Sequence, residues 1–383
     1  MDWPSVSVEE IPADEFVPPH CPRRGCPSEV QGGFAYKKDG SYGRLQDDRR
    51  VPRFRCKRCR KGFSQQSFAF SYYLKRADLT VPIAAQLVGG AAHRQIARAL
   101  SCAPSTVTRR SARLGRHGLC LQALALQEVT IEEPIVYDDF EGFAHSQLQP
   151  TGVGMPVGQR SWFAYGAEAS PHARSGRTTP AQKRRIAKLS LPRHPKSVEA
   201  ALTRVLDRLL PRTSGALRVV SDDHPAYRRA IAAHRHAAGI VREVHPNPTR
   251  GPKGSRRSRA AFLRDTAMFA ADLAHLLLRH SQAHHRRETI AFARRHNALM
   301  ERVHLFLAWK NFVKRRSERR STSVTPAQFI GLADRPWTWS RLLARRLFPW
   351  RIPLTGEDRR IYGREWITPA SGPNIRHALR HAF

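Results

Sequence analysis

The stretch EPIVYDDFEGF, residues 133–143, decides the fold expected for this chain. Its apolar run predicts a buried strand that delivers two carboxylates, Asp138 and Asp139, at its end. An Asp-Asp pair at the end of a strand is also common as a turn former or as the cap of a following helix. One such pair therefore does not define a site.

A second strand of the same form lies in ALRVVSDDHPAYRRAIAAH, residues 216–234. Its apolar run ends in Asp222 and Asp223, and a turn and a helix follow. Between the two stretches, residues 158–170 read as further strands and residues 197–211 as an amphipathic helix. Strands that alternate with helices indicate an α/β layer, with a sheet flanked by helices.

Two strands that end in aspartates bring carboxylates together at one edge of a sheet. Close carboxylates repel each other unless a cation bridges them. Hard oxygen ligands suit Mg²⁺ or Mn²⁺, and two such ions can stabilise the attacking and leaving oxygens of a phosphodiester. The pattern therefore predicts a catalytic Mg²⁺ or Mn²⁺ site.

Four of the six cysteines form two close pairs near the start of the chain. HCPRRGCPSE places Cys21 and Cys26 in a C-x4-C knuckle, and RFRCKRCRKGF places Cys56 and Cys59 in a C-x-x-C knuckle. A segment of this size, residues 15–66, cannot bury enough apolar surface to fold alone, so a tetrahedral zinc would supply the missing free energy.

The second knuckle predicts a strand, a tight turn and another strand, with Phe54 and Phe63 packed over the site. The first knuckle is one residue wider than the commonest form, so an alternative is that Cys21 and Cys26 only lie near an unrelated C-x-x-C. Cys102 and Cys120 have no close pairing and are interpreted as small core residues.

The sequence HRQIARALSCAPSTVTRRSARLGRHG, residues 93–118, predicts a helix-turn-helix within a domain at 67–125. Ser105 is the expected N-cap of its second helix. An exposed charged helix face is often only solvated, but this one suits phosphates and guanine edges. The residues expected to contact DNA are Ser105, Thr106, Thr108, Arg109, Arg110 and Arg113 here, and Arg53, Arg55, Lys57 and Arg58 in the second knuckle.

The 383 residues include 66 Lys and Arg against 31 Asp and Glu, a formal net charge of +35. Such a field favours a polyanionic partner, although a GC-rich coding bias also raises the arginine content. Double-stranded DNA is the expected partner. No run of eighteen apolar residues occurs, and the first sixteen residues form an acidic segment rather than a basic segment followed by an apolar one. These features predict a cytoplasmic protein without a membrane partner.

In this order, the motifs resemble the bacterial insertion-sequence transposases of the DDE type. RFRCKRCRKGFS looks like their zinc ribbon and HRQIARALSCAPSTVTRR is similar to their DNA-reading hairpin. IVYDDFEGF and VVSDDHPAY look like their first and second catalytic strands. The resemblance implies a ribonuclease-H-like catalytic domain at 130–315, with Asp138 and Asp222 as the first two catalytic acids and metal ligands.

The third acid implied by the resemblance lies before a basic stretch, which in this chain is RRETIAFARR, residues 286–295. Counting back from it gives Asp272, with His275 and Arg279 on the same helical face. The family generally has glutamate there, and aspartate is one methylene shorter. Glu301 is the second choice and Glu288 a distant third.

Two stretches rich in Pro, Gly, Ser and Arg, near 170–185 and 245–260, are expected to be mobile loops that contact phosphates. Residues 316–383 are interpreted as a basic C-terminal extension, in which Trp350 is more often a core than a base-stacking residue.

These expectations favour a DNA transposase that binds the ends of an insertion sequence and cuts and joins strands. The reaction and the family imply a homo-oligomer, at least a dimer on DNA. Two alternatives stay open: a DNA-binding regulator that has lost catalysis, and a structure-selective nuclease that cuts without joining.

Overall fold

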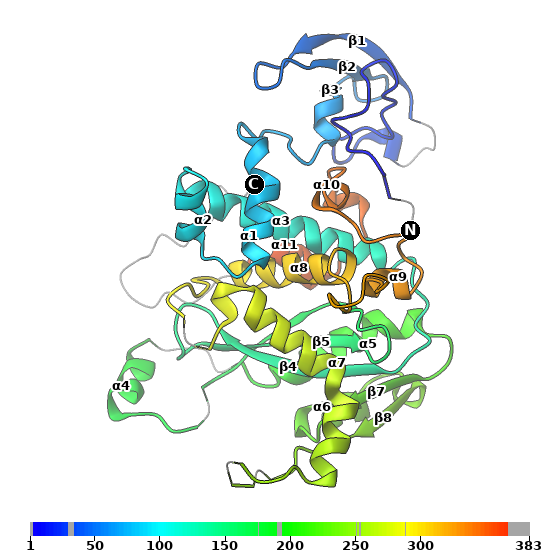
Figure 1. The fold of residues 1–383 in the computed structure, drawn as a ribbon. Coiled ribbons are helices and arrows are strands. Elements are labelled where there is room, and N and C mark those ends of the chain that lie inside the picture. Colours follow the sequence, from blue (N-terminus) through cyan, green and yellow to red (C-terminus); the bar gives the residue numbers. More distant parts are fainter. Residues whose placement is uncertain are drawn as a thin grey trace.

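The chain forms three stacked parts: a small sheet, a layer of helices and a larger sheet with its own helices (Figure 1). This arrangement is that of a computed structural model. It describes residues 3–29, 34–174, 176–189, 194–249, 251–252, 254–287 and 289–366. Glu288 and residues 367–383, the end of the expected extension, lie outside this range.

The small sheet has three antiparallel strands in the order β1-β2-β3. Phe54 of the middle strand pairs in register with Phe63, and both rings stack at 5.7 Å between centroids. Phe54, Phe68 and Phe348 share one buried cluster beside the cysteines. The elements are β1 (Tyr36–Gly43), β2 (Arg50–Cys56) and β3 (Gly62–Ser64), with short 3-10 turns η1 (Pro27–Glu29) and η2 (Gln65–Phe68).

Three helices follow, packed against one another: α1 (Thr80–Val88), α2 (His93–Ala99) and α3 (Pro104–Ala125), after the 3-10 turn η3 (Ala77–Leu79). Pro104 occupies the first turn of α3, where its missing N–H costs nothing. The cap residue is Ala103, so the predicted cap at Ser105 is wrong by two residues.

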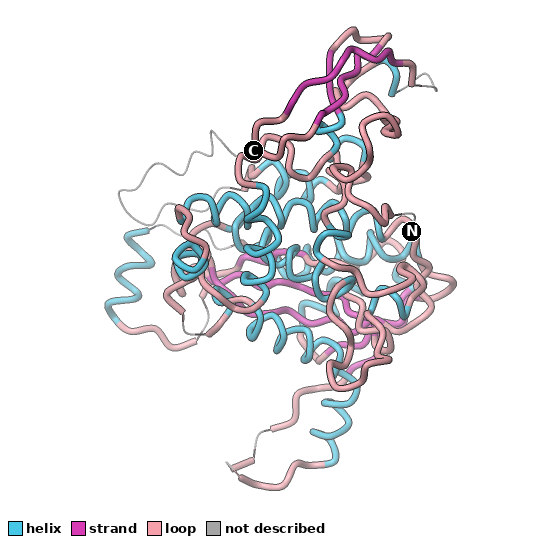
Figure 2. Tube along the Cα trace, turned by 45° about the horizontal axis from the view of Figure 1, so that its top comes forward, coloured by secondary structure: helices cyan, strands magenta, loops and turns pink. Residues whose placement is uncertain are grey.

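The larger sheet is mixed, with five strands in the order β6-β5-β4-β7-β8. Figure 2 shows its strands in magenta among the surrounding helices. β4, β5 and β6 are antiparallel neighbours, whereas β7 and β8 run parallel to β4. This confirms the mixed α/β layer, but residues 158–170, where further strands are predicted, contain only the end of β5 and most of β6. The strands are β4 (Ile135–Phe143), β5 (Pro150–Gly158), β6 (Glu168–Pro171), β7 (Leu217–Ser221) and β8 (Ile240–Val244).

Side-chain alternation along β4 and β7 separates two buried clusters. Ile135 and Tyr137 share a cluster with residues of α5 and α6, whereas Val136 and Phe140 share the other with residues of α7 and α8. The central strand is therefore covered on both faces. These elements are α5 (Ser197–Leu209), η4 (Leu210–Arg212), α6 (Pro225–Ala232), η5 (Ala237–Gly239), α7 (Arg259–Ser281), η6 (Ala283–His285) and α8 (His296–Phe312).

Helices α3 and α8 cross very closely because two glycines of α3 lie where the helices touch. A Cβ added at Gly118 would stand 2.5 Å from the carbonyl oxygen of His304, and one added at Gly115 would clash with the backbone of Glu301. Real Cβ atoms do not approach backbone so closely, so only glycine fits at these two positions.

The C-terminal segment, expected to be an extension, packs across the molecule. Trp337 is buried and stacks on Trp3 at 5.3 Å, and Phe348 enters the aromatic cluster of the small sheet. Trp350 packs against that same cluster, as expected. The elements here are α9 (Pro326–Phe329), α10 (Trp339–Leu342), η7 (Pro349–Arg351) and α11 (Gly356–Gly363).

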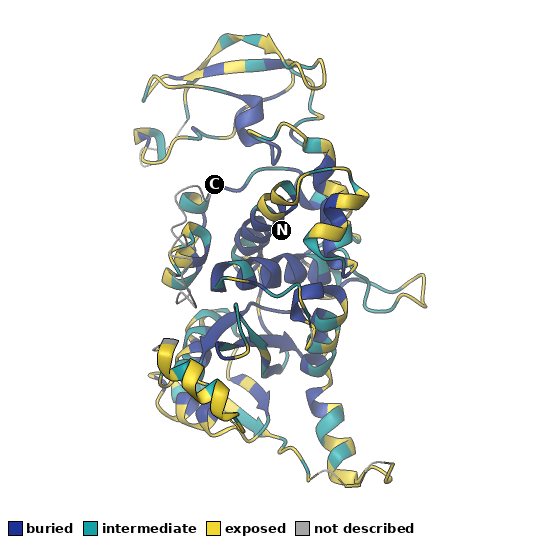
Figure 3. Cartoon of the chain, turned by 90° about the vertical axis from the view of Figure 1, so that its left-hand side faces the viewer, coloured by how far each residue is buried: buried dark blue, intermediate teal, exposed yellow. Residues whose placement is uncertain are grey.

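The first of the two predicted basic loops contains a helix, α4 (Pro180–Leu189), which projects from the body with most of its length exposed (Figure 3). The charged residues of this stretch are compatible with helix because lysine, arginine and glutamine are good helix formers. The described part of the second stretch has no helix or strand before α7 begins at Arg259. None of the described helices combines the length and apolar character needed to span a bilayer.

Candidate functional site

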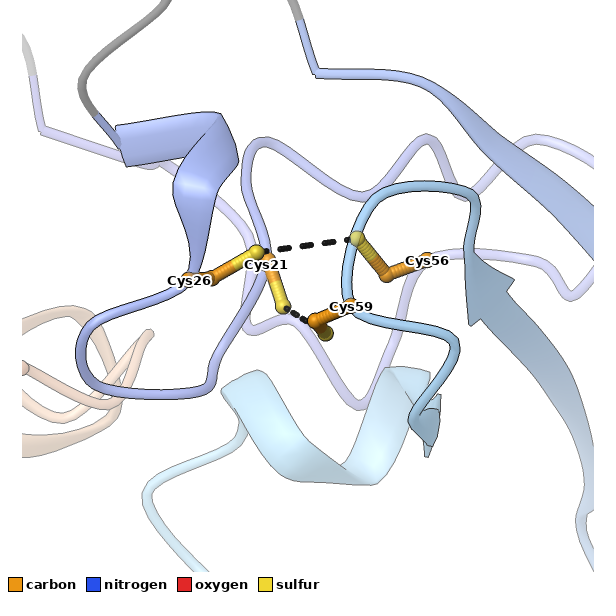
Figure 4. Close-up of side chains that lie close together, drawn as sticks. All are labelled: Cys21, Cys26, Cys56 and Cys59. Carbon is orange, nitrogen blue, oxygen red and sulfur yellow. Dashed lines mark hydrogen bonds between the residues drawn. The ribbon is translucent and has the colours of Figure 1, made fainter.

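Two knuckles bring four cysteine thiols together at the base of the small sheet (Figure 4). Their sulfur atoms all lie within 4.8 Å of one another, with 3.7 Å between Cys21 and Cys59 and between Cys26 and Cys56. A tetrahedron with Zn–S bonds of about 2.3 Å has edges of about 3.8 Å, whereas a disulfide needs about 2 Å. The cluster could therefore bind a metal such as zinc.

Local structure holds these thiols in place. Cys21, Cys26 and Cys56 are buried, and Phe63 packs against them as predicted, whereas Phe54 belongs to the neighbouring aromatic cluster. The turn after Cys56 closes with a hydrogen bond from the Arg60 N–H to the Cys56 carbonyl at 2.9 Å. The other two cysteines are not part of the group, because Cys120 lies in the main core and Cys102 packs against it.

The basic residues predicted on the second knuckle lie on the surface. Arg53, Arg55, Lys57 and Arg58 are all at least partly exposed, and Arg55 pairs with Asp39 at 3.0 Å. Arg53, Lys57 and Arg58 are therefore exposed to an anionic partner, whereas Arg55 already has an acidic one.

The predicted DNA-contacting face of α3 is only partly exposed. Ser105, Thr108 and Arg109 are exposed and Thr106 is half-buried. Arg110, in contrast to the prediction, is buried and donates to the main-chain carbonyl of Arg76 at 2.6 Å.

Arg113 is also drawn into the fold. Its guanidinium lies 5.2 Å from the centre of the Phe70 ring, and burial lowers its pKa to about 10. The helical period explains the difference, because Arg110 and Arg113 lie one turn apart on the side of α3 that faces the preceding segment.

The two predicted catalytic strands lie side by side at the centre of the larger sheet. Ile135 pairs with Val219 and Val136 with Val220 in the parallel register. The same offset places Asp138 level with Asp222, just beyond the end of β7. By alternation, Asp138 shares the face of β4 that α7 covers.

The environment of Asp138 disfavours its negative charge. Burial, followed by the negative charges of Asp222 and Asp139 and more weakly of Asp272, raises its pKa to about 7. His275 of α7 places its Nδ1 3.6 Å from a carboxylate oxygen of Asp138. A carboxylate held among like charges is stabilised by a cation, which fits a metal-binding role.

Asp222 accepts hydrogen bonds on both carboxylate oxygens. The main-chain N–H of His224 donates to one at 3.0 Å, and the side-chain amide of Asn247 donates to the other at 3.0 Å. Asn247 comes from the second basic stretch. Asp223, beside it, is exposed.

Asp139 points to the opposite face of the sheet. The Tyr227 hydroxyl donates to one oxygen and the Ser170 hydroxyl to the other, each at 2.9 Å. Burial nevertheless raises the pKa of Asp139. Its role is to join β4, β6 and α6, and strict alternation of the two neighbouring aspartates could have separated their roles from the sequence alone.

Asp272 lies on α7, within electrostatic reach of Asp138. Arg264, two turns earlier on the same helix, donates to both of its carboxylate oxygens, to one of them at 3.3 Å. Sequence reasoning missed this partner. In the described part of the chain, the four cysteines are the one group of three or more metal-ligating side chains with all ligand atoms within 4.8 Å.

Glu301 has a structural environment. It is 2% exposed on α8, and Arg364 donates to its two carboxylate oxygens at 2.6 and 3.0 Å. Arg116 lies 4.0 Å away. The structure thus places the second choice for the third acid in a buried ion pair with the C-terminal segment.

Two substitutions are expected to separate these acids. Glu301→Gln leaves buried arginines short of a counter-charge and should destabilise the protein by roughly 3–5 kcal/mol. Asp272→Asn, at a side chain that is 40% exposed, should change the melting temperature little. Thermal unfolding followed by circular dichroism measures both, and equal melting temperatures for the two variants would contradict the structural role of Glu301.

Compared with models of known protein families, the sequence matches none, and a search among curated proteins finds no similar chain. The inference of function therefore depends on the fold and the two sites.

Proposed function

We propose that this protein is a DNA transposase of the DDE type that binds the ends of an insertion sequence and cuts and joins DNA strands. The observation that carries the proposal is the register of β4 and β7, which places Asp138 level with Asp222 just after β7, with Asp272 of the covering helix near enough to raise the pKa of Asp138. Acids gathered in this way suit phosphoryl transfer, which needs positioning and charge neutralisation more than a covalent intermediate.

The proposed ribonuclease-H-like fold is supported by the strand order of the larger sheet. The first three strands in the chain, β4, β5 and β6, are antiparallel neighbours, and β4 lies at the centre of the sheet. The next two strands, β7 and β8, run parallel to β4. That is the order of a ribonuclease-H-like sheet, and its central strand carries Asp138.

The proposed metal ligands are Asp138, Asp222 and Asp272. Mg²⁺ or Mn²⁺ held there would neutralise developing charge on the phosphate and activate a water. The raised pKa of Asp138 supports this assignment, because the surrounding carboxylates already disfavour its ionised form without a cation. His275, also on α7, would position Asp138 through its Nδ1, 3.6 Å from a carboxylate oxygen.

The N-terminal parts are proposed to hold DNA. A zinc ribbon formed by the four cysteines would present its exposed arginines to phosphates, and α2 with α3 would form the helix-turn-helix. The exposed Ser105, Thr108 and Arg109 are the residues of α3 best placed to reach base edges. A net charge of +35 supports a polyanionic partner.

A regulator that has lost catalysis is the second candidate. The pairing of Asp272 with Arg264 favours it, because a guanidinium that binds both oxygens of the third acid competes with a metal ion. The choice between the two functions depends on whether a divalent ion displaces Arg264.

The proposal is tested by incubating the zinc-loaded protein with a labelled DNA duplex that carries the ends of its own insertion sequence. Nicking at the ends in Mn²⁺, and none without added divalent metal, is expected of a transposase. Specific binding to the ends without nicking would instead establish the regulator. Cutting at branched DNA of unrelated sequence without joining would identify a nuclease.

A further inference from the structure

A basic cavity of about 420 Å³ opens at the end of the central strand, and its wall contains none of Asp138, Asp222 and Asp272. Its wall is built by the last residues of β4, the first residue of β5, the residue after β6, the end of α7 and the segment that follows η6. Glu141 in this wall follows Asp138 by three residues, which is about 10 Å along a strand. Its size is within the range of small-ligand sites.

Positive charge dominates the wall. Arg174, Arg279, Arg286 and Arg287 line the cavity, against the single acid Glu141. That acid is already paired, with its Oε1 3.3 Å from Nε2 of His172. The arginine charges that remain have no matching acid in the wall, so an anion that enters is stabilised.

The guanidinium of Arg279 is held in a defined position at the floor. It lies 4.5 Å from the centre of the Phe140 ring, one of the largest fully buried side chains. Burial, and then the charge of Arg287, lowers the pKa of Arg279. The two positive charges therefore repel each other, and a bound anion would relieve that repulsion.

Two buried histidines add hydrogen-bonding capacity. His284 and His285 are only 8% and 4% exposed, and in the described structure the Nε2 atom of each has no hydrogen-bond partner. Burial, followed by the charge of Arg302, lowers the pKa of both, that of His285 to about 3. Each is therefore a neutral imidazole in the cavity wall, with a buried Nε2 that lacks a hydrogen-bond partner in the described structure.

We infer that this cavity binds a phosphate group of a nucleic-acid strand that also reaches Asp138 and Asp222. Arginine forks recognise phosphate, and buried neutral donors beside them distinguish a seated anion from a diffuse cationic surface. The inference deepens the proposed function and rests on it for the identity of the strand. A free phosphate ion shares the same chemistry and is the other possible source.

The test measures binding of a fluorescent twelve-nucleotide single strand to the full-length, zinc-loaded protein by anisotropy, without added Mg²⁺ or Mn²⁺. The double variant Arg174→Gln/Arg287→Gln removes two cavity charges from its rim. The matched control, Arg319→Gln/Arg320→Gln, removes two exposed charges elsewhere. Thermal unfolding of each variant checks its fold.

The cavity variant is expected to bind about tenfold or more weakly than the control. Its plot of log affinity against log salt should also be shallower by about 0.7 for each phosphate that the protein no longer neutralises. Arg174→Lys/Arg287→Lys should restore much of this salt dependence. Equal affinities and slopes for cavity and control variants would overturn the inference, because the arginines would then act only through net charge.

Competition identifies the source of the phosphate. Millimolar inorganic phosphate that leaves strand binding unchanged supports a strand-bound group, whereas full displacement through the cavity arginines would assign the site to the free ion and overturn the strand. Because no step requires cleavage, a protein that never nicks DNA can still pass this test. A protein that nicks normally can equally fail it.

Discussion

Asp138→Asn and Asp222→Asn are each expected to lower metal-dependent strand cleavage at least about a thousandfold, since each removes a charge on which the metal and the reacting phosphate depend. Both changes keep the shape of the side chain. Mn²⁺ affinity by calorimetry and nicking of end-bearing DNA would fall together in these variants. The exposed neighbour Asp223 provides the matched control, because Asp223→Asn should retain both properties.

Asp138→Asn is also expected to change the stability of the protein in a definite direction. The pKa of Asp138 in the folded protein, about 7, is above its ordinary 3.8, so its contribution to stability is lost as pH rises between these values. Asparagine carries no charge, and Asp138→Asn should therefore melt at the same temperature as the native protein or higher at pH 8. Wild-type nicking and Mn²⁺ binding by both aspartate variants would rule out this catalytic site.

Under the proposed function the four cysteines hold one zinc ion, and its removal is expected to unfold the small sheet. Structural zinc contributes roughly 10–16 kcal/mol in small domains, more than such a sheet can gain from its own core. Cys56→Ser should lose the single bound zinc and bind DNA much more weakly, whereas Cys102→Ser should keep both properties. Metal analysis and limited proteolysis within residues 15–66 measure the effect.

The extent of the unfolding is informative because Phe348 of the C-terminal segment packs in the aromatic cluster of that sheet. A local unfolding should leave the melting of the larger sheet in place while the N-terminal region becomes sensitive to protease. Zinc retained at one ion per chain in Cys56→Ser would show that the knuckles do not act as one site.

Local patterns were enough to predict the elements that carry the chemistry. The apolar runs of β4 and β7 and the spacing of the cysteines depend on neighbouring residues, and both strands and the cysteine cluster are present. The predicted position of Asp138 and Asp139 at the end of their strand is wrong, because β4 continues to Phe143 and pairs with β5 along its whole length. The facing of Asp138 and Asp139 could also have been derived, because alternation in a strand is strict.

Pairings between distant segments could not be derived in the same way. Glu301 and Arg364 are separated by 63 positions, and no local pattern indicates that they meet. The stacking of Trp3 on Trp337 likewise cannot be predicted from any local pattern in the sequence. The sequence predicts Arg110 on an exposed, DNA-contacting helix face, whereas the tertiary fold provides a carbonyl for its buried guanidinium.

The close contact between α3 and α8 at the two glycines fixes the position of α3 relative to the rest of the molecule. At 1.5 Å per residue, the 22 residues of α3 span about 33 Å, from an exposed first turn to a second half locked against α8. Because α3 packs so closely on α8, the two helices move together as one rigid body. Under the proposed function, the number of base pairs between the sequence that is read and the bond that is cut would therefore be set by the length of one helix.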